Sequence, residues 1–163
     1  MRAPALIACL LILVPMAPLA AGTASGQDKV LYDTPPWSVT GSADGQMCDA
    51  RVLTEDRLFE LAALKEGALI NVAGKDWNFA RHVGMMHVVA GEGSGFGMNA
   101  LYAGFSVHAG TSNAKGLYLL MVTLGSDVET LNIKDDTLKN IATFKVTGMS
   151  KALDAWKACA DKL

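Results

Sequence analysis

Residues 47–73 read MCDARVLTEDRLFELAALKEGALINVA, and this stretch decides the fold class. Its apolar residues recur at every second position in three successive runs, which is the spacing of β-strands. Two short polar segments, TED and KEG, separate the runs as turns. The residues that share the inward face are Cys48, Ala50 and Val52, then Phe59, Leu61 and Ala63, then Ala68, Ile70 and Val72.

The same alternation of apolar and polar residues continues after this stretch. Trp77 and Phe79 alternate, and ATFKVTG near the C-terminus reads as a strand with Ala142, Phe144 and Val146 facing inward. The other expected strands are Met85–Ala90, Phe96–Tyr102, Phe105–Ala109 and Leu117–Leu124. Short strands at this spacing predict a mainly β protein, an antiparallel β-sandwich or barrel.

Two segments are expected to be helical. Ser126 and Glu129 fit a capping box, so the segment from Ser126 to Lys139 is expected to hold a short helix. The clearer helix is 149–162, where apolar residues recur every three or four positions and form one face. Lys157 and Lys162 lie near its C-terminal end, where positive charge suits the helix dipole. This C-terminal helix is expected to pack on the sheet.

The N-terminus has the plan of a secretory signal peptide over residues 1–26. Arg2 precedes an apolar run, and small residues follow it up to Gly26. Cleavage after Gly22, Ala24 or Gly26 fits the pattern equally well. The apolar run is shorter than the ~20 residues of a membrane span. We therefore expect residues 27–163 to form one exported domain, in the periplasm or at the cell surface, without a transmembrane segment.

Composition narrows the possible partners. Hydrophobic residues make up 51% of the chain, and its formal net charge is −2. Such a chain can build a real core, and it lacks the basic surface that holds nucleic acid or an anionic membrane. The expected partner is therefore a protein or a small molecule of unknown identity.

Two cysteines remain once Cys9 leaves with the signal peptide. An even pair in an oxidising compartment predicts a disulfide between Cys48 and Cys159. It would tie the C-terminal helix to the early strand that carries Cys48. The alternative is two buried free thiols.

Both ends of the domain carry a family resemblance. A Trp-led strand, WSV, is followed eleven positions after Trp37 by Cys48, and FKVTGMSKALDAWKAC ends in Cys159. These segments resemble the invasion-associated locus B family of small exported alphaproteobacterial proteins. The resemblance implies a β-sandwich with a C-terminal helix in the periplasm or at the cell surface. It also implies a role in host interaction or envelope stress, and it carries over no catalytic residue.

The segment ARHVGMMHVVAGEGSGFG, residues 80–97, raises the possibility of a metal site. His82, Met86 and His87 are ligand types that periplasmic copper proteins use, because thioether sulfur suits Cu(I) and imidazole suits either copper state. On a strand, however, His82 and Met86 point one way and His87 points the other. A third ligand would have to come from elsewhere, with His108 or Met98 nearest. We therefore treat metal binding as the alternative function.

The glycine-rich run that follows has no phosphate-loop pattern, since no lysine follows it and strands flank it. We expect a hairpin connection, with Gly91, Gly93, Ser94 and Gly95 as candidate binding-loop residues. No catalytic motif and no cofactor motif is present in the sequence. The expected function is an exported, non-enzymatic binding or interaction protein. A metal-binding protein and an enzyme with an unrecognised site are the alternatives.

Overall fold

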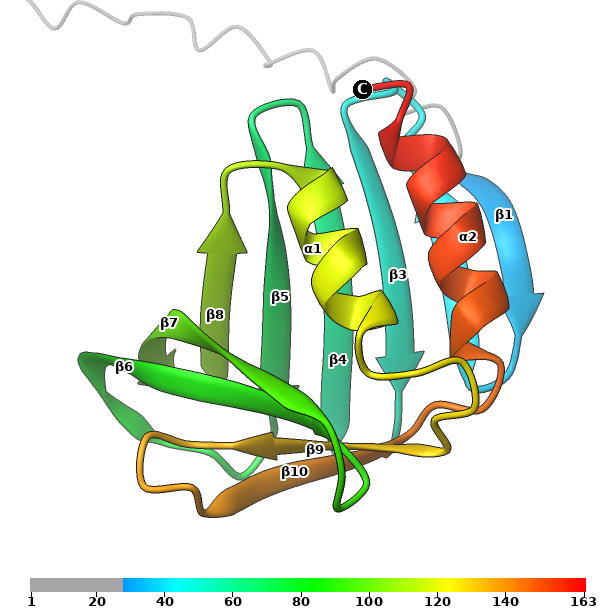
Figure 1. The fold of residues 1–163 in the computed structure, drawn as a ribbon. Helices are drawn as coiled ribbons and strands as arrows, with labels where there is room; N and C mark the ends of the chain where they lie inside the picture. Colours follow the sequence, from blue (N-terminus) through cyan, green and yellow to red (C-terminus); the bar gives the residue numbers. More distant parts are fainter. Residues whose placement is uncertain (1–27) are drawn as a thin grey trace, which may run out of the picture.

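The computed structural model describes residues 28–163, so the predicted signal peptide and Cys9 lie outside the described residues. Strands dominate this part of the chain, and two helices accompany them (Figure 1). In chain order the elements are β1 (Lys29–Thr34), β2 (Trp37–Gly41), β3 (Met47–Leu53), β4 (Arg57–Leu64), β5 (Gly67–Gly74), β6 (Phe79–Ala90), β7 (Gly95–Gly104), β8 (Ser106–Thr111), α1 (Ala114–Val122), β9 (Thr130–Lys134), β10 (Asn140–Lys145) and α2 (Met149–Ala160).

The ten strands form one antiparallel sheet in the order β1-β2-β3-β4-β5-β8-β7-β6-β9-β10. The sheet curls into a half-barrel, with both helices against its inner side and β9–β10 crossing below them (Figure 1). The predicted mainly β, antiparallel class with a C-terminal helix and one disulfide is confirmed. Of the two predicted architectures, the barrel describes this single curled sheet better than two facing sheets do.

Strand register explains why the inner side is apolar. Residues that lie opposite each other on neighbouring strands share one face of the sheet. One such row crosses six strands, and all its members are buried: Val39, Ala50, Leu61, Ile70, Ala109 and Ala100. The alternation that the sequence predicted for β3, β4 and β5 therefore produces the core.

Two tryptophans anchor the ends of the chain in this core. The Trp37 indole donates a hydrogen bond to the Val146 carbonyl at 3.2 Å, and the Trp156 indole donates one to the Cys48 carbonyl at 3.0 Å. Both side chains are essentially unexposed. Because a buried indole N–H needs an acceptor, these bonds fix where β2 meets the end of β10 and where α2 meets β3. Trp77 differs, since it is only partly buried.

The segment expected to be a strand over Leu117–Leu124 is instead the core of helix α1, so that prediction was wrong. Asn113 caps the helix, and its side-chain oxygen accepts a hydrogen bond from the Gly116 N–H at 2.6 Å. Leu117 and Met121, four positions apart, are the two residues buried by the helix. The four-residue spacing of the buried side chains, together with the Asn113 N-cap, therefore favours a helix over a strand here.

The helix expected between Ser126 and Lys139 was also wrong, because β9 occupies this segment. Leu131 and Ile133 alternate with less buried neighbours, and Thr130 to Lys134 pair with β10. Pairing with β6 on the other side adds further backbone hydrogen bonds. The C-terminal helix was predicted over 149–162 and extends over Met149–Ala160.

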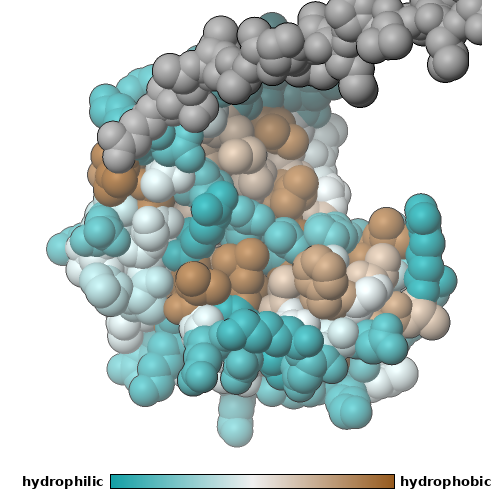
Figure 2. All heavy atoms as spheres, turned by 180° about the vertical axis from the view of Figure 1, so that it is seen from behind, coloured by the Kyte–Doolittle hydropathy of each residue, from teal (hydrophilic) through white to brown (hydrophobic). Residues whose placement is uncertain are grey.

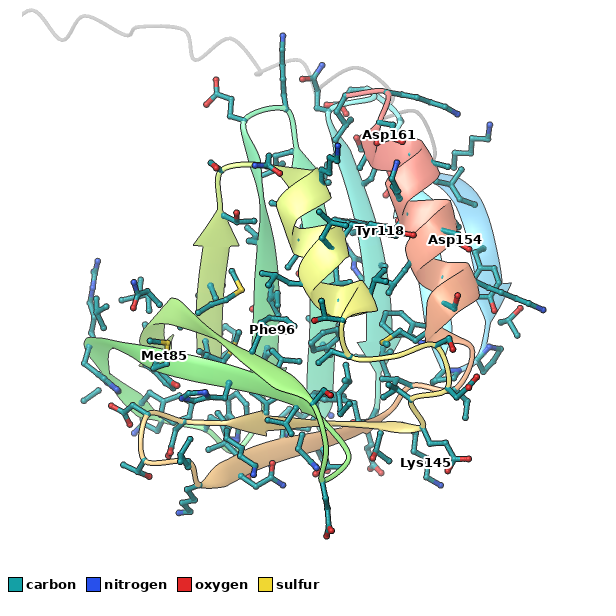
Figure 3. All side chains as sticks on the ribbon, viewed as in Figure 1. Met85, Phe96, Tyr118, Lys145, Asp154 and Asp161 are labelled. Carbon is teal, nitrogen blue, oxygen red and sulfur yellow. A yellow bond between two sulfur atoms is a disulfide. The ribbon has the colours of Figure 1, made fainter. Side chains whose placement is uncertain are left out.

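Helices α1 and α2 lie side by side over the sheet. The Tyr118 hydroxyl on α1 donates a hydrogen bond to an Asp154 carboxylate oxygen on α2 at 3.1 Å, and Figure 3 shows the two side chains pointing toward each other. Neither helix in residues 28–163 has the length and apolar character that crossing a membrane requires.

Candidate functional site

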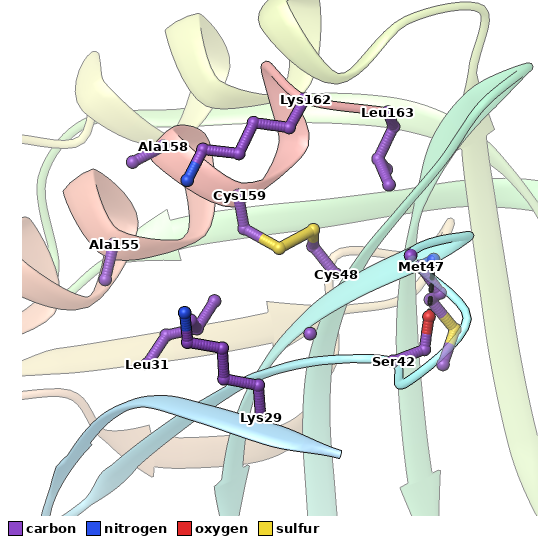
Figure 4. A pocket seen from close by; sticks show the side chains of 12 residues that line it. Lys29, Leu31, Ser42, Met47, Cys48, Ala155, Ala158, Cys159, Lys162 and Leu163 are labelled. Carbon is purple, nitrogen blue, oxygen red and sulfur yellow. Dashed lines mark hydrogen bonds between the residues drawn. A yellow bond between two sulfur atoms is a disulfide. The ribbon is translucent and has the colours of Figure 1, made fainter. Parts of the chain in front are cut away.

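The candidate site is a pocket between the C-terminal end of α2, strand β1 and the turn that joins β2 to β3 (Figure 4). Its volume is about 400 Å³. Binding sites for small molecules range over roughly 300–1,000 Å³ and are mostly apolar with a few polar groups. The apolar part of this wall is formed by Leu31, Met47, Ala155, Ala158, Leu163 and the disulfide.

The disulfide between Cys48 and Cys159 forms one side of this pocket (Figure 4), which confirms the predicted pairing. It spans 111 residues in sequence, with 6.0 Å between the two Cα atoms. Gly41 lies against it, because a Cβ at this position would be 3.1 Å from the Cys159 sulfur. Cys48 is completely buried, whereas Cys159 is only partly buried.

The turn between β2 and β3 forms the rim of the pocket. The Ser42 hydroxyl accepts hydrogen bonds from the backbone N–H groups of Gln46 at 3.1 Å and Met47 at 2.9 Å. Gly45 has a φ of 67°, a left-handed conformation that glycine adopts without a steric penalty. The side-chain hydrogen bonds of Ser42 therefore hold this rim in one conformation.

Among the described residues, Lys29 and Lys162 are the charged ones that line the pocket, and no acidic side chain lines it. Both side chains extend to the same side of the disulfide (Figure 4). Neither lysine forms an ion pair within residues 28–163. Lys157, by contrast, pairs with Asp161 four positions later on the same helix. Two ammonium groups thus face an apolar cavity without a carboxylate partner.

The structure does not bring the candidate metal ligands His82, Met86 and His87 together. Met86 is fully buried in the core. His82 is exposed and stacks on the Tyr102 ring, with 4.6 Å between the ring centroids. His87 lies on the other face of β6, beside Gly97. Within residues 28–163, no cluster of three or more His, Cys, Asp or Glu side chains is arranged to hold a metal ion.

The glycine-rich segment forms the expected hairpin connection between β6 and β7. Gly91 has a φ of 52° and β7 begins at Gly95, where a Cβ would approach the Val88 carbonyl oxygen to 2.9 Å. Gly91, Gly93 and Ser94 line a shallow depression of about 530 Å³ with the segment 124–130, whereas Gly95 does not. This depression is more open and more polar than the disulfide pocket, so it fits a small ligand less well.

A row of charged and polar side chains crosses the face of the sheet opposite the helices. The register places Arg51, Glu60, Asn71 and His108 next to one another on β3, β4, β5 and β8. Arg51 Nε lies 2.8 Å from a Glu60 oxygen and 2.6 Å from an Asp49 oxygen. Figure 2 shows polar groups set among apolar ones on the side of the molecule opposite the view of Figure 1.

Asp49 is the most unusual member of this surface because it is only 2% exposed. Burial raises the pKa of its carboxyl above the ordinary value of 3.8. The hydrogen bond from Thr40, at 2.8 Å, and the charge of Arg51 oppose the rise only in part. Desolvation therefore outweighs the favourable partners.

We expect Asp49→Asn to remove part of the pH dependence of stability. Between the ordinary pKa of 3.8 and the raised native pKa, the folded chain binds more protons than the unfolded chain. The free energy of unfolding of the parent therefore falls as pH rises through this interval. Asn keeps the hydrogen bond from Thr40 but carries no charge, so the variant gains stability relative to the parent as pH rises.

Urea denaturation from about pH 3 to about pH 7 checks this prediction. Asp33→Asn, at an exposed position of β1, is the matched control. A stability difference between variant and parent that stays constant, or that shifts in favour of the parent, as pH rises would contradict the prediction.

One serine and one histidine lie within hydrogen-bond distance on the same face. Ser106 Oγ is 2.8 Å from His108 Nε2, but Ser106 is only 7% exposed. No carboxylate in the described residues bonds to the other nitrogen of His108, which a serine–histidine–acid triad would need.

Burial, together with the charges of Asp136 and Asp135, raises the pKa of Tyr102 to about 12, so this phenol is neutral at ordinary pH.

The comparisons with known proteins add no relative. The chain matches no family model, no curated protein and no solved structure. The resemblance to the invasion-associated locus B family therefore stays a prediction.

Sequence reasoning found the disulfide but missed the pocket around it. Lys29 and Leu31 lie near one end of the domain, and Lys162 and Leu163 lie near the other. No motif links them, and for Lys162 the sequence predicts only a charge that suits the helix dipole. The usable signal was the predicted disulfide itself, since it brings the end of the C-terminal helix to the β2–β3 turn.

Proposed function

We propose that this protein is an exported, non-enzymatic binding protein, and that it binds a small ligand in the disulfide pocket. The observation that carries the proposal is the pocket itself, an apolar cavity of about 400 Å³ whose charged lining residues, Lys29 and Lys162, have no acidic partner in the lining. Within residues 28–163, its lining holds no histidine, no carboxylate side chain and no free thiol. Such a wall can bind and orient a molecule, but it offers no proton acceptor at neutral pH or activated nucleophile.

Export is supported by the sequence and by the cysteines. Residues 1–26 have the plan of a signal peptide, and the Cys48–Cys159 disulfide suits an oxidising compartment. Both features support the proposed periplasmic or surface location. The resemblance to the invasion-associated locus B family adds host interaction or envelope stress as the proposed biological setting.

We expect that filling the pocket weakens the binding of a neutral apolar dye. Ala158 lines the pocket near the end of α2, so Ala158→Trp places an indole in or across the cavity. We expect the affinity for Nile red to fall by about tenfold or more, because tenfold needs a loss of only about 1.4 kcal/mol of apolar contact. Fluorescence titration of the exported, oxidised protein measures this.

Ala80→Trp is the matched control, since Ala80 is exposed on β6 and does not line the pocket. The control should bind the dye as the parent does, and both variants should retain the parent's circular dichroism. Equal binding by Ala158→Trp and the parent would show that the dye binds elsewhere, and the proposed site would be wrong.

A further inference from the structure

The disulfide pocket combines an apolar wall with two lysines. The chain has a formal net charge of −2, yet the charged lining residues of the pocket are both lysines. Asp28, the acid next to Lys29, does not line the pocket, and its carboxylate accepts a hydrogen bond from the Ala43 N–H at 3.3 Å. The charged side chains in the lining are therefore opposite in sign to the net charge of the whole molecule.

The two lysines come from opposite ends of the domain. Lys29 is the first residue of β1, and Lys162 lies two positions after Ala160, the last residue of α2. Their side chains end on the same side of the disulfide (Figure 4). A lysine places its charged end in water and lays its apolar stem along hydrophobic surface. Both stems can therefore extend the apolar wall, while both ammonium groups meet the same end of a bound molecule.

The remainder of the wall suits a hydrocarbon body. Leu31, Met47, Ala155 and Leu163 supply aliphatic and thioether surface. The thioether chain of methionine adapts to ligands of different shape. Because a lysine ammonium is a compact, rotatable point charge, it selects the charge of the head group more than its shape.

We propose that the ligand of this pocket is a single-chain anionic amphiphile, such as a fatty carboxylate, with its head held by Lys29 and Lys162. The hydrocarbon chain lies against Leu31, Met47 and the disulfide. This inference rests on the proposed binding function, and it adds the chemical class of the ligand. Binding is a non-covalent, reversible step.

Three probes with the same chain and different heads test the inference: decanoate, decanol and decyltrimethylammonium, each used below its micelle concentration. Titration calorimetry and displacement of Nile red report their affinities for the exported, oxidised protein. We expect decanoate to bind about tenfold more tightly than decanol, and the cationic probe to bind most weakly. Added salt should weaken decanoate binding and leave decanol binding unchanged, because salt screens exposed charges.

Substitution of the lysines gives the second half of the test. Lys29→Gln and Lys162→Gln should each reduce decanoate affinity by about threefold, and the double variant should bind decanoate and decanol about equally. The matched control is the double variant Lys65→Gln, Lys145→Gln, since both residues are exposed and do not line the pocket. Figure 3 shows Lys145 at the end of the molecule opposite Asp161, which neighbours the pocket residue Lys162.

The outcomes separate this inference from the proposed function. Tighter binding of decanoate that the control retains and the Lys29–Lys162 double variant loses supports both. Equal binding of the three probes, or a carboxylate preference that survives in the double variant, overturns the inference and leaves an apolar binding pocket. Failure of every probe and of Nile red to bind overturns the proposed function as well.

Discussion

Trp156→Ala is expected to destabilise the protein by about 3–5 kcal/mol, the range for a large aromatic side chain deleted from a core. Trp156 is completely buried, and its indole N–H bonds to the Cys48 carbonyl at 3.0 Å. The substitution leaves a cavity between α2 and the sheet, and it leaves that carbonyl without its donor. Since domains are stable by only about 5–15 kcal/mol, this is a large share of the total. Urea denaturation followed by circular dichroism measures it.

Two further variants show which part of the Trp156 side chain matters. Trp156→Phe keeps an apolar ring but loses the N–H, so we expect a cost of about 1–3 kcal/mol from the carbonyl left unpaired. Trp77→Ala is the comparison at a partly buried position, and it should cost less than Trp156→Ala. If Trp77→Ala proved as costly as Trp156→Ala, burial at the α2–sheet interface would not explain the effect.

The parts of the fold that the sequence predicts are those where local spacing and packing agree. In β3, β4 and β5 the inward residues alternate, and the register places them in common rows across the sheet. Helix α2 has the corresponding helical spacing, with Trp156 on its buried face. At these positions a single strand or helix can bury its apolar face in only one way, so the pattern determines the conformation.

Helix α1 shows where this reasoning fails. Its sequence between Leu117 and Val122 is almost continuously apolar, and such a short run fits a buried strand as well as a helix. The residue that decides the conformation is Asn113, whose side chain caps the helix. Ser126 and Glu129 gave the opposite error, since their capping-box pattern predicted a helix where strand β9 forms. Pairing of β9 with both β6 and β10 outweighs the local capping preference.

The candidate site could not be predicted, because its residues converge only in the folded chain. Lys29 and Lys162 are more than a hundred positions apart, and each reads as an ordinary surface lysine. The candidate metal ligands show the reverse case. His82, Met86 and His87 are close in sequence, but the fold does not bring them together. The sheet places Met86 in the core and His87 on the other face. Successive side chains along a strand point to opposite faces of the sheet, so residues that are close in sequence can be held apart. The disulfide, in contrast, brings distant segments of the chain together.

Loss of the disulfide is the other large effect that we expect. Cys159→Ser should lower the free energy of unfolding by about 2–5 kcal/mol, as is typical when small secreted domains lose a native disulfide. The reason is the long loop of 111 residues between the two cysteines, which the bond closes in the unfolded chain. Cys159 is the cleaner position to replace, because it is partly exposed, whereas Cys48 is completely buried. Thermal melting without reductant measures the change.

A reductant provides the control, because it removes the bond without changing the sequence. The parent protein in strong reductant should melt near the temperature of Cys159→Ser, and the variant should be insensitive to reductant. Equal melting of oxidised parent and variant would refute a stabilising role for the bond. Since the disulfide also forms one side of the pocket, the variant should bind Nile red more weakly at temperatures where it is still folded. The bond between β3 and α2 would then determine both the stability of the domain and the shape of its binding site.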